Sequence, residues 1–137
     1  MKRILQEDGT GCGIACIAMI TGRSYQQIKD ELIKMPGYSA KGPFYTDASE
    51  LRALAKSQGV SLIKRKRKFK EWKLVPNGSI LAIRFKEKNS EQEWHWVVFN
   101  RINGREFVID PKKSIKTDQR TDFGRIKAKW YLPIIST

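Results

Sequence analysis

Cys12 lies in a segment whose residue types favour a nucleophilic thiol. The stretch Gly9-Thr10-Gly11-Cys12-Gly13 leads into a run of small apolar residues, so Cys12 is expected at the N-terminus of a buried helix. The first backbone N–H groups of a helix lack intrahelical partners, and the helix dipole is positive there. Both features favour the thiolate, which is the form that attacks a carbonyl carbon. Cys12 is therefore our candidate nucleophile.

A nucleophilic thiol needs a base, and His95 is the only histidine of the chain. It lies near the start of a segment, residues 94–102, that is predicted to be a strand. The dipeptide Asn103-Gly104 follows and is typical of a two-residue β-hairpin turn, with residues 105–110 as the returning strand. The turn predicts that Arg101 pairs with Glu106, and this pair of opposite charges supports the register.

The predicted register brings His95 close to Asp110. Val97 faces Asp110, and His95 lies on the same face two residues earlier, which makes it a diagonal neighbour of Asp110. Diagonal neighbours in a sheet are roughly 7–8 Å apart, and long side chains bridge that distance. A carboxylate on one imidazole nitrogen fixes the tautomer and leaves the other nitrogen for a thiol.

Each candidate residue also has an ordinary structural explanation. A free cysteine is often a small core residue, and we assign that packing role to Cys16. His95 is compatible with a satisfied strand histidine, Asp110 with a turn residue, and Gln6 with the surface of an N-terminal arm. A closed zinc site takes four ligands, whereas Cys12, Cys16 and His95 are the only soft ligands, so no metal and no cofactor are expected. The ordered set Gln6, Cys12, His95, Asp110 favours catalysis.

The elements that must position these residues are helices followed by strands. We expect a first helix over residues 12–21 and two more that begin with capping boxes, Ser24 with Gln27 and Asp47 with Glu50. The intervening residues 35–46 are expected to form a loop that contributes to the rim of a substrate cleft. Strands are expected over residues 60–70, 79–85, 94–102, 105–110 and 129–135.

Two features refine the expected sheet. Residues 86–93 are expected to be a polar connection, and Pro133 is expected to confine the last strand to a sheet edge. Helices followed by an antiparallel sheet are the α+β pattern, and 137 residues fit one domain, residues 1–137.

The charged residues are unevenly distributed along the chain. The chain has a net charge of +13; residues 1–63 carry 8 Lys/Arg against 6 Asp/Glu, and residues 64–137 carry 19 against 8. A basic half suits an anionic partner, either a nucleic acid or an acidic protein, through the run Lys64–Lys70. The same run equally suits an edge strand protected against pairing with other strands.

The sequence also limits the expected setting. No apolar run approaches the ~20 residues of a membrane helix, so no membrane span is expected. The basic start lacks the apolar stretch of a signal peptide. We therefore expect a cytoplasmic protein whose two cysteines are reduced.

The chain resembles the papain-like cysteine peptidases that cut double-glycine leader peptides in bacteriocin processing. The likeness rests on Gln6, Gly11-Cys12-Gly13, His95-Trp96-Val97-Val98 and Val108-Ile109-Asp110-Pro111. Such peptidases occur as N-terminal domains of bacteriocin-exporting ABC transporters and as free-standing relatives. The resemblance implies a papain-like α+β fold, with Cys12 as nucleophile, His95 as base and acid, Asp110 as orienter and Gln6 in the oxyanion hole. The family usually has aspartate where this chain has Gly11.

Three functions agree with this pattern. The first is a cysteine peptidase that cleaves a peptide bond through a thioester on Cys12. The second is a papain-like toxin or effector domain that acts on a host protein or on RNA, which the basic second half motivates. The third is a non-catalytic module that binds a peptide without cutting it.

Overall fold

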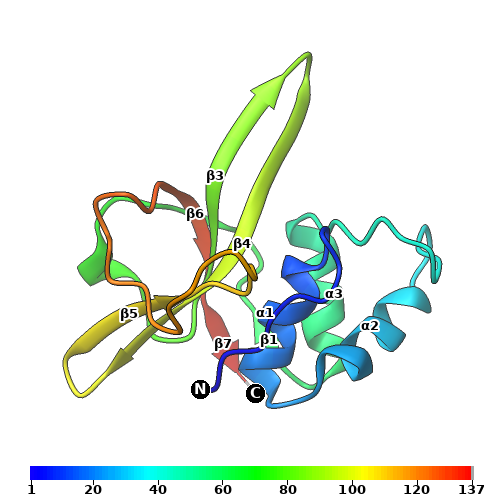
Figure 1. Ribbon diagram of the computed structural model, residues 1–137, viewed down its shortest axis with the longest axis horizontal. Helices are drawn as coiled ribbons and strands as arrows, with labels where there is room; N and C mark the ends of the chain where they lie inside the picture. The colour runs from blue at the N-terminus through cyan, green and yellow to red at the C-terminus, as the bar shows by residue number, and fades with distance from the viewer. Residues whose placement is uncertain (137) are drawn as a thin grey trace.

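The computed structural model describes residues 1–136 and confirms the predicted α+β architecture. Helices α1 (Cys12–Thr21), α2 (Tyr25–Ile33) and α3 (Ala48–Ser57) come first and pack together on one side of the molecule, and the strands follow (Figure 1). No helix in the described range is long and apolar enough to cross a membrane.

Local sequence signals set the ends of the helices as predicted. At α2, the Ser24 side chain accepts a hydrogen bond from the Gln27 N–H, and the Gln27 side chain accepts one from the Ser24 N–H. Asp47 and Glu50 form the same reciprocal pair at α3. Helix α1 ends where Gly22 takes φ +71°, which glycine adopts without steric cost.

The strands of the described chain form two antiparallel sheets. The larger sheet has the order β2-β6-β3-β4-β5, and β1 pairs with β7 in a smaller one. A short 3-10 helix, η1 (Trp72–Leu74), precedes β3. The strands in chain order are β1 (Ser61–Leu62), β2 (Arg67–Lys68), β3 (Ile80–Lys88), β4 (Glu91–Ile102), β5 (Arg105–Ile109), β6 (Ala128–Leu132) and β7 (Ile134–Ser136).

Two predictions about the ends of the sheet were wrong. Residues 60–70 are not one strand, because β1 and β2 lie in different sheets. The last predicted strand is likewise divided, and its first part, β6, is an interior strand between β2 and β3. Pro133 separates β6 from β7 and accepts a hydrogen bond from the Ile63 N–H at 2.9 Å. Proline therefore marks the crossing between the sheets rather than an edge.

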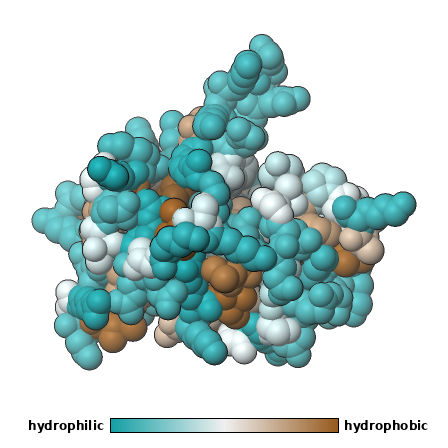
Figure 2. Space-filling view, in the orientation of Figure 1, coloured by the Kyte–Doolittle hydropathy of each residue, from teal (hydrophilic) through white to brown (hydrophobic). Residues whose placement is uncertain are grey.

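The prediction for residues 86–93 was also wrong. These residues extend β3 and β4 into a hairpin that closes at Asn89-Ser90 and projects beyond the rest of the sheet (Figure 1). Its tip is hydrophilic on the face shown in Figure 2. Both faces of the extension are polar, so the alternation of apolar and polar residues that indicates a half-buried strand is missing.

The β4–β5 hairpin has the register that its turn predicts. Phe99 pairs with Val108, and Arg101 pairs with Glu106. The Arg101 Nε donates a hydrogen bond to Glu106 Oε2 at 2.8 Å. The strand that contains His95 is therefore fixed against β5, directly before Asp110.

Apolar side chains cover both faces of the larger sheet. Successive side chains of β3 and β4 point to opposite faces of the sheet. One set of apolar side chains therefore packs against the helices, and the other packs against the loops on the opposite face. The first set includes Ile80, Ala82, Trp96 and Val98; the second includes Leu81, Ile83, Val97 and Phe99. Helix α1 packs against β4 in this arrangement, which brings Cys12 to the strand of His95.

Candidate active site

Two glycines give Cys12 its place in the first turn of α1. A Cβ atom at Gly11 would lie 1.9 Å from Tyr25 Oη, and one at Gly13 would lie 2.3 Å from Thr46 Oγ1. Neither position has room for a side chain unless its neighbour moves. Tyr25 occupies the space that a side chain at position 11 would need, which accounts for the glycine there.

The sulfur of Cys12 faces strand β4. The backbone N–H of Trp96 donates a hydrogen bond to Cys12 Sγ at 3.4 Å, and the residue is 9% exposed. This N–H and the helix N-terminus both stabilise negative charge on sulfur. Cys16 is 0% exposed, and burial, with a smaller contribution from neighbouring Cys12, holds its pKa well above the usual value. Cys12 is thus the thiol placed for chemistry, and Cys16 packs in the core.

Asp110 is a buried carboxylate that accepts hydrogen bonds from three neighbouring residues. It is 1% exposed and accepts hydrogen bonds from His95 Nε2 at 2.7 Å, Arg120 Nη1 at 2.8 Å and the Lys112 N–H at 3.0 Å. Burial by itself raises the pKa of Asp110, but the hydrogen bond and charge of His95, followed by Lys112 and Arg120, lower it below the usual value. Asp110 is therefore ionised at neutral pH.

His95 is held between Asp110 and Cys12. Burial disfavours the charged imidazole and lowers its pKa, but the hydrogen bonds to Asp110 and Cys12 and their charges outweigh burial and raise the pKa to about 9. Because Nε2 bonds to Asp110, Nδ1 is the nitrogen available to the thiol. The predicted juxtaposition of His95 and Asp110 is confirmed, and the sulfur of Cys12 is hydrogen-bonded to the backbone of Trp96, the next residue of the same strand.

Two arginines that the sequence analysis did not identify secure the Asp110 segment. Arg120 bonds to the Asp110 carboxylate and also to Asp122. Arg3 donates from Nε to the Asp110 carbonyl at 2.8 Å and from Nη2 to the Lys112 carbonyl at 2.8 Å. No local motif distinguishes either from the other basic residues of the chain.

Gln6 is buried beside the same segment. Its backbone N–H donates to the Pro111 carbonyl at 2.9 Å. Its side-chain Nε2 donates to the carbonyls of Asp8 at 3.1 Å and Gly9 at 3.2 Å, and its Oε1 is buried without a partner in the described chain. The Gln6 amide therefore shapes the loop that leads to Cys12, and its N–H groups are directed at that loop.

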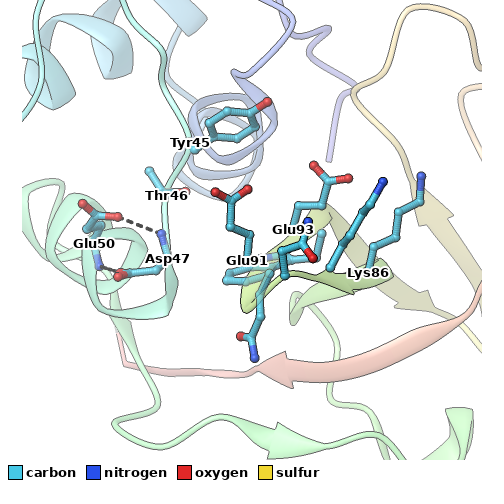
Figure 3. A pocket seen from close by; sticks show the side chains of 11 residues that line it. Tyr45, Thr46, Asp47, Glu50, Lys86, Glu91 and Glu93 are labelled. Atoms are coloured by element: carbon cyan, nitrogen blue, oxygen red, sulfur yellow. Dashed lines mark hydrogen bonds between the residues drawn. The ribbon is translucent and has the colours of Figure 1, made fainter.

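A groove of about 870 Å³ opens beside the site (Figure 3). One wall is the Tyr45–Glu50 segment, and the other is the projecting part of the β3–β4 hairpin with Lys86, Glu91 and Glu93. The Trp96 indole N–H donates to Thr46 O at 3.0 Å and so ties the first wall to β4. The predicted loop of residues 35–46 thus ends in a wall of the groove.

The basic run Lys64–Lys70 lies at the sheet edge around β2. Its lysines and arginines are exposed, and none of them forms an ion pair within residues 1–136. The Lys66 ammonium lies 3.8 Å from the ring centroid of Trp130. Both an anionic partner and protection of the edge agree with this arrangement, so the anionic partner stays a prediction.

Within the described residues, no cluster of three or more His, Cys, Asp or Glu side chains is arranged to hold a metal ion. The groups that meet at the site are a thiol, an imidazole and a carboxylate. Nucleophilic acyl transfer is the chemistry for which these three group types are suited, because an imidazole can move a proton and a carboxylate can orient the imidazole.

Comparison with known proteins agrees with this chemistry. No curated protein matches the sequence. The family model described as Peptidase C39 family matches residues 1–133, which is nearly the whole chain. The chain therefore belongs to the Peptidase C39 family, and it is a cysteine peptidase with the papain-like α+β fold.

Proposed function

We propose that this peptidase cuts its substrate through a thioester on Cys12, with His95 as base and acid and Asp110 as its orienter. The observations that carry the proposal are the contact of the Asp110 carboxylate with His95 Nε2 at 2.7 Å and the hydrogen bond to Cys12 Sγ from the N–H of Trp96, the residue after His95, at 3.4 Å. The order of these groups is the one that nucleophilic acyl transfer requires.

The reaction begins with attack of the Cys12 sulfur on the peptide carbonyl carbon. His95 takes the thiol proton before the attack, as its raised pKa favours, and gives a proton to the leaving amine as the C–N bond breaks. Water then attacks the thioester with His95 as base, which releases the carboxylic acid and restores the thiol. The carboxylate of Asp110 holds the imidazole ring in position throughout and balances its positive charge.

The oxyanion of the tetrahedral intermediate needs donors. The Cys12 backbone N–H at the start of α1 supplies one, and the Gln6 amide supplies the other once it turns from the carbonyls of Asp8 and Gly9. Removing one oxyanion donor costs about 10²–10³ in kcat. Gln6→Ala is therefore expected to lower kcat by that factor without preventing alkylation of Cys12.

The proposed substrate is a peptide with two glycines before the scissile bond, as in leader peptides of the bacteriocin-processing type. The supporting observation is the membership of the chain in the C39 family together with the sequence likeness around Cys12, His95 and Asp110. A peptide that carries Gly-Gly at this position should be cut after the second glycine, whereas its Val-Val counterpart should remain intact.

Intact-mass analysis after brief treatment with iodoacetamide at pH 6 tests the roles. We expect one adduct, located on Cys12, and at least a tenfold slower reaction in His95→Ala. Cys16→Ala is the matched control and should react like the wild type. Equal slow labelling of Cys12 in the wild type and His95→Ala would contradict the proposal. Binding of the Gly-Gly peptide without cleavage would indicate the non-catalytic module instead.

A further inference from the structure

Arg84 has an unusual backbone conformation directly beside the active site. Its φ is +55°, a left-handed conformation in which the Cβ of an L-residue crowds the following carbonyl. The cause is a β-bulge: β3 and β4 pair at Ile83 with His95 and again at Lys86 with Glu93, so one extra residue lies on β3 between these pairs.

The other neighbour of β3 holds the bulge in place. The pairing of β3 with β6 also shifts between Ala82 and Ile83, and the Arg84 N–H donates to the Lys127 carbonyl at 3.3 Å. The conformation of Arg84 is thus imposed from both sides of the strand. Strained residues of this kind concentrate at functional sites, where the surrounding structure maintains them.

The bulge places Arg84 next to the catalytic imidazole. Arg84 and His95 line the same small hollow, about 130 Å³ in volume, and this hollow shares four residues with the large groove of Figure 3. Arg84 therefore lies where the groove meets His95. The shared residues are Tyr45, Lys86, Glu93 and Trp94.

The guanidinium of Arg84 has no bonding partner in the described part of the chain. Its side chain is exposed and forms no hydrogen bond or ion pair within residues 1–136, whereas Arg3, Arg101 and Arg120 each bind several backbone or carboxylate oxygens. A guanidinium presents five donors in a planar fork that matches a carboxylate. Lys86 and Glu93 also line the hollow, and their opposite charges balance. Arg84 therefore gives the lining a net charge of +1 when His95 is neutral.

We propose that Arg84 is a specificity-determining residue that binds a substrate carboxylate close to the scissile bond. The carboxylate is either an Asp or Glu side chain or the C-terminus of a short substrate. This inference rests on the proposed function, because it takes Cys12 and His95 as the place where the bond is cut. The strained backbone at Arg84 is explained by this role, because the bulge places the Arg84 cation at the hollow beside the imidazole.

The first test uses two small electrophiles that differ in charge. Iodoacetate carries a carboxylate and iodoacetamide does not, and both alkylate Cys12. We expect the rate constant for iodoacetate, divided by that for iodoacetamide, to fall at least threefold in Arg84→Gln and Arg84→Gly. The control is Arg23→Gln, which removes an exposed arginine after α1, outside the groove, and should leave this ratio unchanged. An unchanged ratio in both Arg84 variants overturns this inference alone, whereas a Cys12 that reacts with neither reagent overturns the proposed function.

Arg84→Gly separates the guanidinium from the fold. Glycine accepts φ +55° without crowding, so this variant should have a melting temperature about 3 °C above the wild type while it loses the preference for iodoacetate. A variant that loses both stability and the preference would indicate a merely structural role for the Arg84 side chain.

The second test uses substrate peptides in matched pairs. One pair replaces Asp by Asn beside the scissile bond, and the other replaces a free C-terminal carboxylate by its amide. We expect one acidic member to be cut with a roughly tenfold higher kcat/KM, and Arg84→Gln to abolish that advantage. The pair that responds identifies the source of the carboxylate. Equal kcat/KM in both pairs would refute the proposal.

Discussion

Strand β4 belongs to two hairpins that close through the same kind of turn. Asn103 and Gly104 take φ +51° and +80° at the β4–β5 turn, and Asn89 and Ser90 take φ +52° and +67° at the β3–β4 turn. Left-handed φ at both central residues is the mark of the type I′ turn, whose twist matches that of the strands. The two turns are therefore alike, and the hairpins differ in how the strands next to each turn are paired and buried.

The β4–β5 hairpin is regular and buried at its base. Its pairs run without a shift from Ile102–Arg105 to Val98–Ile109, which sets the distance between His95 and Asp110. The β3–β4 hairpin has a bulge next to His95, and beyond it the strands are exposed and line the groove. Regular pairing thus holds His95 and Asp110 together, and the irregular pairing beside them shapes the groove.

Of the two hairpins, the regular one should have the larger effect on catalysis. Asp110→Asn keeps the size of the side chain but removes the charge that orients and balances His95, so kcat should fall by about 10²-fold. Arg120→Met leaves the carboxylate in place and removes one of its partners, and a loss of roughly tenfold is expected. Peptide cleavage measured at constant pH compares the two. Equal losses would show that orientation, not charge, is the contribution of Asp110.

The charge on His95 predicts a pH effect on stability. Its pKa is raised from 6.5 to about 9, so between these values the folded protein holds a proton that the unfolded chain has released. The contribution is complete below pH 6.5 and is lost as the pH rises through about 9, which amounts to about 3 kcal/mol. Urea unfolding at pH 6 and pH 9.5 should show this loss in the wild type but not in His95→Gln. Parallel behaviour of both proteins would contradict the expectation.

The exposed hairpin should affect binding more than chemistry. Residues 87–92 can be replaced by Asn-Gly, because Lys86 and Glu93 are directly paired and a two-residue loop can close on them. KM should rise roughly tenfold because one wall of the groove is shortened, which is about 1.4 kcal/mol of binding energy. Alkylation of Cys12 by iodoacetamide is the control and should keep its rate. Slower alkylation would mean that the hairpin also supports the catalytic groups.

The smallest expected effects compare the two turns. Gly104→Ser introduces a side chain at φ +80° and should lower the free energy of unfolding by about 1 kcal/mol. Ser90→Gly makes the opposite change at φ +67° and should raise it by roughly 0.5 kcal/mol. Thermal melts read both, and neither variant should change kcat. A large loss of kcat in Gly104→Ser would show that the catalytic geometry depends on this turn.

Local signals were sufficient for the helices and for one hairpin. The capping residues at Ser24 and Asp47 and the Asn103-Gly104 turn act over a few residues, so the sequence around them determines the structure. The β3–β4 extension was missed because Asn89-Ser90 lacks the glycine that marks such turns. The position of β6 was missed because neighbours in a sheet are set by packing across the chain, which one segment does not encode.

The same distinction applies to the site. The pairing of His95 with Asp110 follows from a two-residue turn and the period of a strand, and it could be predicted. The contacts of Arg120 with Asp110 and the bulge at Arg84 depend on how a loop and a third strand lie against the hairpin. Such contacts have no sequence signal of their own in a chain with 27 Lys and Arg residues.

The burial of Cys16 has a practical consequence. Its thiol is 0% exposed in α1, between the other helices and the sheet, so a bulky disulfide reagent reaches it only when this part of the core opens. Once Cys12 is blocked, the rate at which Cys16 reacts measures the opening of the native core, without any added label. The reactivity of Cys16 thus reports the opening of the core in the unmodified sequence.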